Sequence, residues 1–165
     1  MRRPRPERPG PGQESVWDYP RPPTVDPSRE HVRVWFAGRI VGDSHAAVRV
    51  CETSHPPVYY LPREDVDASA LAPTERRTWC EFKGQAAYAD LLVEGQRSAH
   101  ACWWYPRPTP GYEVLTDRIA FYPQRVERIT VDDETVRSVQ GDFYGGWITS
   151  RVVGPFKGGP GTEWW

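Results

Sequence analysis

The stretch that decides the fold is HVRVWFAGRIVGD, residues 31–43. In its first half, Val32, Val34 and Phe36 alternate with Arg33 and Trp35, which is the two-residue period of a strand with one buried face. An Ala-Gly turn follows, and the remaining residues return as a second strand. The chain is therefore expected to enter its folded core as a β-hairpin.

Further short segments with strand character follow this hairpin, separated by Pro, Gly and acidic residues that favour turns. We expect one helical turn at 63–66, a loop at 67–75 and a short helix at 112–117. Strands are predicted at 46–51, 58–61, 76–80, 88–93, 97–102, 119–122 and 128–131. This pattern predicts a mainly β fold, a compact, closed or nearly closed β-barrel-like domain with one or two short helical turns.

Two segments repeat the same order of features. Residues 33–62 and 90–123 each contain a strand, a turn at glycine, a second strand and an aromatic run that ends in proline. A degenerate internal duplication would produce this order. Chance is the alternative, because β-hairpins are common.

Composition divides the chain into three parts. Residues 1–30 are rich in Pro and Gly and nearly lack aliphatic residues, so they predict an extended arm that Trp17 and Tyr19 could dock onto the domain. The β-rich core domain is expected over 31–140. Residues 141–165 are rich in Gly and Trp, and the apolar Trp rings predict a tail that packs on the core.

Charge and hydropathy exclude several classes of function. The formal net charge is −1, which offers no global attraction for nucleic acid or for an anionic membrane. No apolar run reaches the length of a membrane span, and no apolar segment follows the basic start as a secretory signal requires. We expect a cytoplasmic protein in which Cys51, Cys80 and Cys102 are reduced thiols.

Several strings resemble one known family. Residues 52–62, ETSHPPVYYLP, and residues 80–88, CEFKGQAAY, resemble the two signature stretches of the bacterial domain-of-unknown-function 427 family, which is also filed under a nucleotidyltransferase-like label. WYP at 104–106 and AFY at 120–122 resemble its later landmarks, and the Gly/Trp-rich tail resembles an extension of some members. The resemblance implies a compact β-rich domain and little about activity.

Lys83 is the first candidate catalytic residue. Only two of the 21 basic residues are lysines, and both occur in the string Phe-Lys-Gly. Partial burial between Phe82 and Gly84 would lower the pKa of Lys83 toward neutrality, which suits Schiff-base or general-base chemistry. The alternative is a structural lysine paired with Glu81 or Glu52.

Glu52 and Tyr60 complete the candidate catalytic set. Glu52 lies at a strand end before the Pro56-Pro57 break and could act as a general base, with Tyr60 as general acid. In the alternative interpretation, Glu52 binds amides of the loop and His55 caps it. The expected substrate-binding residues are His55, Tyr59, Cys80, Tyr88 and Trp104, although cysteines and aromatic rings also serve as core residues.

Metal and phosphate sites are not expected. The spacing of Cys51, Glu52, His55 and Cys80 matches no zinc pattern, and Pro160 interrupts the glycine-rich 154–161 loop where a phosphate-binding loop needs free amides. We therefore expect a cofactor-free enzyme of lyase or hydrolase type that acts on a small polar metabolite in an aromatic-lined pocket. A non-catalytic module for a small molecule or peptide is the alternative. No nucleic-acid or membrane partner is expected, and a homodimer is left open.

Overall fold

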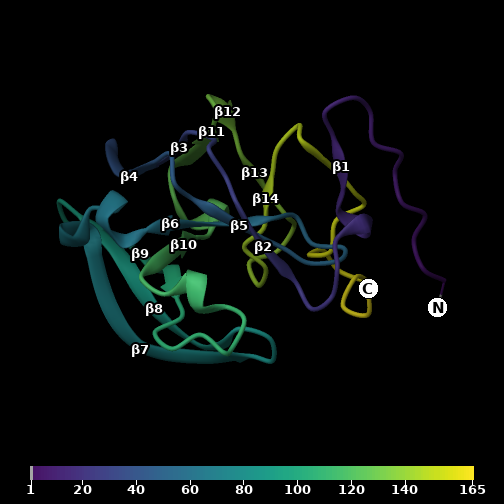
Figure 1. Ribbon diagram of the computed structural model, residues 1–165. Coiled ribbons are helices and arrows are strands. Elements are labelled where there is room, and N and C mark those ends of the chain that lie inside the picture. The colour runs from purple at the N-terminus through teal and green to yellow at the C-terminus, as the bar shows by residue number, and fades with distance from the viewer. Residues whose placement is uncertain (1) are drawn as a thin grey trace.

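The computed structural model describes residues 2–165 and consists of short strands, single 3-10 turns and connecting loops (Figure 1). The 3-10 turns are η1 (Val16–Asp18), η2 (Arg63–Asp65), η3 (Ala68–Ala70), η4 (Glu113–Leu115) and η5 (Pro123–Arg125). The strands are β1 (Glu14–Ser15), β2 (Thr24–Pro27), β3 (Val32–Phe36), β4 (Arg39–Ser44), β5 (Val48–Cys51), β6 (Val58–Pro62), β7 (Leu71–Cys80), β8 (Gly84–Val93), β9 (Gln96–Trp104), β10 (Arg118–Phe121), β11 (Arg128–Val131), β12 (Glu134–Thr135), β13 (Arg137–Ser138), β14 (Trp147–Ile148) and β15 (Val152–Val153).

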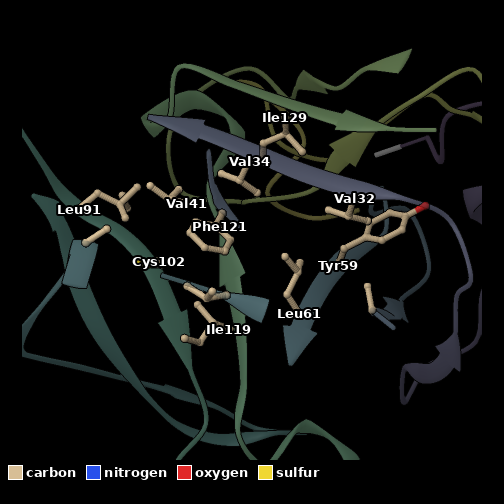
Figure 2. Close-up of a cluster of buried hydrophobic side chains, with 14 of the residues drawn as sticks. Val32, Val34, Val41, Tyr59, Leu61, Leu91, Cys102, Ile119, Phe121 and Ile129 are labelled. Atoms are coloured by element: carbon tan, nitrogen blue, oxygen red, sulfur yellow. The ribbon is translucent and has the colours of Figure 1, made fainter. Parts of the chain in front are cut away.

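Two open sheets form the body of the molecule. Seven strands pair in the order β2-β5-β6-β10-β9-β8-β7, and four pair in the order β12-β11-β3-β4. Buried residues of both sheets meet in one apolar core, in which Val34 and Ile129 of the smaller sheet face Leu61 and Phe121 of the larger one (Figure 2). Burial of this shared layer is the main favourable term in holding the two sheets together.

The mainly β prediction is confirmed, but the expectation of a closed barrel is not. Within residues 2–165 the larger sheet ends at β2 and β7, and no pairing joins these two edges. In a closed barrel, the sheet would bury its own inner face. Here the smaller sheet covers that face of the larger sheet and buries it.

The longest strands begin earlier than the sequence suggested. β7 begins at Leu71, although residues 67–75 were expected to be a loop, and β8 begins at Gly84 rather than Tyr88. A register shift between Pro73 and Arg77 explains the first difference, since a bulge lets β7 accommodate a proline within a paired strand. The two segments with similar feature order form hairpins in different sheets, β3–β4 in one and β8–β9 in the other.

The N-terminal arm and the C-terminal tail lie together. β1 pairs in parallel with β15, and the indole Nε1 of Trp17 donates to the Pro155 carbonyl oxygen at 2.9 Å. β2 pairs with β5 as the edge of the larger sheet, so paired structure of that sheet begins before residue 31. Trp147 of the tail is fully buried within the shared core, deeper than the surface packing expected for this segment.

The second face of the larger sheet carries its own aromatic cluster. Tyr60, Tyr88, Trp103 and Tyr122 belong to this cluster, together with Tyr105 from the segment after β9. Both faces of the central strands are therefore apolar. Among residues 2–165, no helix has the length and apolar character needed to cross a bilayer.

Candidate functional site

A cavity of about 700 Å³ opens over this aromatic cluster. That volume lies within the range of about 300–1,000 Å³ that is typical of small-molecule sites. Its walls come from the larger sheet, from the loop before β6, from the turn between β7 and β8, and from the tail. The aromatic rings around it belong to Tyr60, Trp79, Phe82, Tyr88, Trp103, Tyr105, Tyr122, Phe143 and Tyr144.

The loop between β5 and β6 is fixed by backbone hydrogen bonds from both ends of the chain. From the arm, the Val16 carbonyl accepts from the amide of Ser54 at 3.0 Å. From the tail, the amide of Lys157 donates to the Ser54 carbonyl and that of Trp147 donates to the Pro57 carbonyl, each at 2.8 Å. These bonds hold the Glu52–His55 turn at the cavity wall.

His55 has a defined tautomer. Its Nδ1 lies 2.8 Å from the Thr53 carbonyl oxygen, which can only accept, so Nδ1 carries the proton and Nε2 of the neutral ring carries the lone pair. Burial lowers the pKa of His55, and the positive charges of Lys157 and Arg21 lower it further, against an opposing effect of Glu52. His55 is therefore neutral at pH 7, and it lines the cavity.

Glu52 lies beside this histidine. One carboxylate oxygen is 3.3 Å from Nη2 of Arg21 and 3.7 Å from Nδ1 of His55. The second distance is too long for a hydrogen bond but close enough to stabilise an imidazolium. Glu52 is thus paired with Arg21 of the arm, and its negative charge favours the protonated form of His55.

Tyr60 forms part of the cavity floor as a neutral phenol. The indole Nε1 of Trp103 donates to the Tyr60 hydroxyl at 3.2 Å. Because an indole can only donate, the Tyr60 oxygen accepts in this bond and its own proton remains available to another acceptor. Burial raises the pKa of Tyr60, so the phenol keeps that proton at neutral pH.

Lys83 lies on the same cavity in the turn between β7 and β8, and its ammonium group is 5.7 Å from the centre of the Tyr105 ring. Burial alone would lower the pKa of Lys83, but the neighbouring Tyr60, Cys80 and Glu52 outweigh burial and raise it. The expectation of a lowered pKa is therefore wrong. Lys83 is a cation, and no carboxylate of residues 2–165 lies within ion-pair distance of it, so the structural pair with Glu81 or Glu52 does not form.

The predicted site residues divide according to the face of the sheet they occupy. Lys83, Glu52 and Tyr60 line the cavity, and so do the predicted binding residues His55, Cys80 and Tyr88. Tyr59 points instead into the shared core and donates to Glu30 through its hydroxyl, while Trp104 packs beneath Arg63. Each lies next in sequence to a cavity residue, and successive strand side chains point to opposite faces.

The three cysteines differ in how deeply they are buried. Cys51 and Cys102 are buried as expected for core residues, and burial raises the pKa of their thiols to about 11 and about 12. Cys80 is half-buried beside Lys83. Across residues 2–165, no three His, Cys, Asp or Glu side chains are grouped in a way that could hold a metal ion.

Sequence reasoning missed the contribution of the chain ends to the cavity. Arg21 comes from the arm, and Tyr144 and Lys157 come from the tail. The Tyr144 ring lies edge-on to His55, with ring centres 5.1 Å apart. The one signal that pointed to Lys157 was the repeated Phe-Lys-Gly string, which it shares with Lys83.

Comparison with known families assigns the chain to one of them. The profile described as "Domain of unknown function (DUF427)" matches residues 24–132, about two thirds of the sequence. Comparison with curated protein sequences found no match. The chain belongs to the DUF427 family, and residues 133–165, which supply one wall of the cavity, lie beyond the matched region.

Proposed function

We propose that this DUF427 protein is a cofactor-free enzyme that performs acid–base chemistry, of lyase or hydrolase type, on a small polar metabolite. The observation that carries the proposal is the state of His55, whose Nδ1–H is bound to the Thr53 carbonyl while Nε2 is left to accept a proton at a cavity wall. A neutral histidine of this kind is the most common general base in enzymes.

In the proposed reaction, Nε2 of His55 takes a proton from the substrate or from a water molecule that attacks it. The resulting imidazolium is stabilised by the Glu52 carboxylate 3.7 Å away. This role differs from the sequence-based hypothesis, in which Glu52 itself is the base, because Glu52 is already paired with Arg21.

Negative charge that develops on the substrate requires stabilisation. Lys83 supplies a cation with no carboxylate counter-ion in residues 2–165, and Tyr60 supplies a phenolic proton. Both groups border the cavity that His55 borders. Fixed donors of this type in a partly desolvated site contribute strongly to lowering an activation barrier.

The alternative is a non-catalytic binding module, and the pairing of polar groups favours it. The hydroxyl of Tyr88 is 2.8 Å from that of Thr78, the Tyr60 hydroxyl accepts from Trp103, and Glu52 is held by Arg21. Groups engaged in this way recognise a ligand by shape without a proton transfer.

Incubation of the protein with a panel of small 2-oxo acids, aryl carboxylates and their esters, followed by proton NMR in D₂O, tests the proposal. Deuterium incorporation or consumption of at least one compound is expected with the wild type, with a loss of about 100-fold or more in the His55→Gln variant. His45→Gln is the control, because His45 is exposed and stacks on His31 away from the cavity. Binding of panel members without any turnover would overturn the enzyme proposal in favour of the binding module.

A further inference from the structure

The only two lysines of the chain border the same cavity. They account for two of its 21 basic residues, and they are 74 positions apart in sequence, at 83 and 157. Lys83 lies in the turn between β7 and β8, whereas Lys157 comes from the tail after β15. Two separate walls of the cavity therefore each contribute an ammonium group.

Neither lysine is paired with an acidic side chain within residues 2–165. No Asp or Glu carboxylate lies within 4.0 Å of either ammonium group. Lys157 is buried, donates to a main-chain oxygen of Trp165, the last residue of the sequence, at 3.2 Å and lies 5.5 Å from the centre of the Tyr144 ring. This contact compensates part of the Lys157 charge, whereas Lys83 has no acidic side chain of residues 2–165 in range. Incomplete compensation of a desolvated charge is costly, and binding an anion would lower that cost.

The carboxylates of the cavity do not balance its cations. Asp142 and Glu81 are exposed, so they contribute little to the interior. Glu52, which is less exposed, is paired with Arg21. The interior thus keeps a surplus of positive charge although the whole chain has a formal net charge of −1.

Aromatic rings make up much of the remaining lining. Trp103 and Tyr122 lie with ring centres 4.4 Å apart, and the guanidinium of Arg125 lies over Tyr122 at 4.2 Å. Flat rings at a cavity wall favour a flat ligand, because stacked and edge-on contacts both require a planar partner.

We infer that the ligand of this cavity is a small planar anion, a carboxylate or a phosphate ester on an unsaturated body, whose charge is recognised by Lys83 and Lys157. The inference rests on the proposed function, since it names the substrate class of the same site. Lys83 would meet the charged group beside the Tyr60 phenol, and Lys157 would meet it, or a second anionic group, from the tail.

Reductive methylation with ¹³C-formaldehyde provides a direct test, because dimethylation keeps the lysine charge and this chain gives only two side-chain signals. The signals are assigned with Lys83→Met and Lys157→Met variants. The probes are 2-naphthoate, 2-naphthyl phosphate and the uncharged 2-naphthamide. Affinities are measured in parallel on unmodified protein by tryptophan fluorescence.

At least one of the two anions is expected to shift both dimethyl-lysine signals and to bind ten-fold or more tightly than the amide. Each lysine variant should reduce this ratio at least three-fold. Arg77→Met, which removes a neighbouring cation that bonds the Thr74 and Arg76 carbonyls outside the cavity, should leave it unchanged. The tighter of the two anions identifies the charged group as carboxylate or phosphate.

If 2-naphthoate and 2-naphthyl phosphate both bind no more tightly than 2-naphthamide, the inference is overturned, while proton transfer at His55 stays possible as a function. Anion binding that moves neither lysine signal, or no binding of any probe, would also overturn it. Conversely, anion recognition in a protein that turns over no compound of the panel would support this inference and reject the enzyme proposal.

Discussion

The ring of Trp147 stacks on the ring of Tyr59, with centres 4.9 Å apart and planes inclined by 18°. Trp147 belongs to the tail and Tyr59 to β6, and both are almost completely buried. The indole Nε1 also donates to the Phe121 carbonyl of β10 at 3.0 Å. The tail is therefore built into the core between the two sheets, and the loop that precedes Trp147 reaches the cavity.

Replacing Trp147 with Ala is expected to lower the free energy of unfolding by about 3–5 kcal/mol, because the substitution leaves a large cavity in a close-packed core. Urea denaturation followed by circular dichroism measures the loss. Trp164→Ala is the control, since Trp164 is 45% exposed, and it should cost far less. A loss from Trp147→Ala no greater than that of the control would show that the tail does not hold the core.

Glu14 links the arm to the sheet, and its removal should strand a buried charge. Its carboxylate binds Arg49 at 3.2 Å, and the Arg49 side chain is only 5% exposed. Glu14→Gln is expected to cost about 3–5 kcal/mol, the range for breaking a buried pair on one side. Glu75→Gln, on an exposed residue of β7, is the control. Chemical denaturation at pH 7 compares the two, and equal stabilities would contradict the prediction.

The same contact predicts acid sensitivity. Burial raises the pKa of Glu14, but hydrogen bonds from Tyr19 and Arg49 outweigh burial and hold it below the ordinary 4.5. The unfolded state therefore binds this proton first as pH falls, so the stabilisation is present above pH 4.5 and is lost below it. This part of the acid-induced loss should be absent from Glu14→Gln, as measured by unfolding free energies from pH 6 to pH 3.

His55 should titrate below its ordinary pKa of 6.5, because burial disfavours its charged form. The unfolded state then takes up the proton at a higher pH than the folded state. Stability is lost as pH falls below 6.5, and activity that needs neutral His55 is retained until pH reaches the lowered value. NMR titration of the imidazole measures this pKa. A midpoint at or above 6.5 would remove His55 as a neutral base.

Lys83→Met should leave the protein folded, with an unfolding free energy within about 1 kcal/mol of the wild type or above it. The reason is that Lys83 has no carboxylate partner to strand within residues 2–165. A structural pair would lose about 3–5 kcal/mol instead. Thermal and urea unfolding of the variant decides between these outcomes, and a large loss would restore the structural interpretation of Lys83.

Gly145 fixes the tail against the cavity wall. A Cβ at this position would lie 2.6 Å from Cη2 of Trp103 and 3.0 Å from Cδ1 of Tyr122. Gly145→Ala is expected to push the tail loop outward and to cost about 1–3 kcal/mol, as overpacked sites do. Gly10→Ala in the arm, where the nearest atom is the end of a flexible Gln13 side chain, is the control. Unchanged stability and unchanged naphthoate affinity would contradict this arrangement.

Strand positions could be predicted from the sequence because alternation and turn residues are local properties. Strands over 32–36 and 128–131 follow that pattern and pair with each other. The start of β7 could not be predicted, since a strand that accommodates Pro73 through a bulge carries no periodic signal. Whether a sheet closes into a barrel depends on whether its two edge strands pair with each other. That pairing depends on contacts between segments that are distant in sequence, so the local pattern did not reveal that the sheets stay open.

The cavity could be predicted only in part for the same reason. Alternation shows that Tyr59 and Tyr60 point to opposite faces, but both faces of β6 are apolar, so the sequence does not say which face is hollow. The two family-like strings indicated Glu52 and Lys83, which do meet at one cavity. Lys157 and Tyr144 reach the cavity because the tail packs against the sheet, and no local sequence pattern indicates that contact.

The cavity wall that residues 142–145 and Lys157 form determines how much of the chain is needed to keep the cavity complete. A protein cut to the family-matched residues 24–132 would keep Tyr60 and Lys83 but would lose Arg21, Tyr144 and the second lysine. The family-matched region and the lining of the cavity therefore end at different residues in this chain. Ligand-binding experiments on this protein therefore need the full sequence, because the family-matched residues alone would leave one wall of the cavity open.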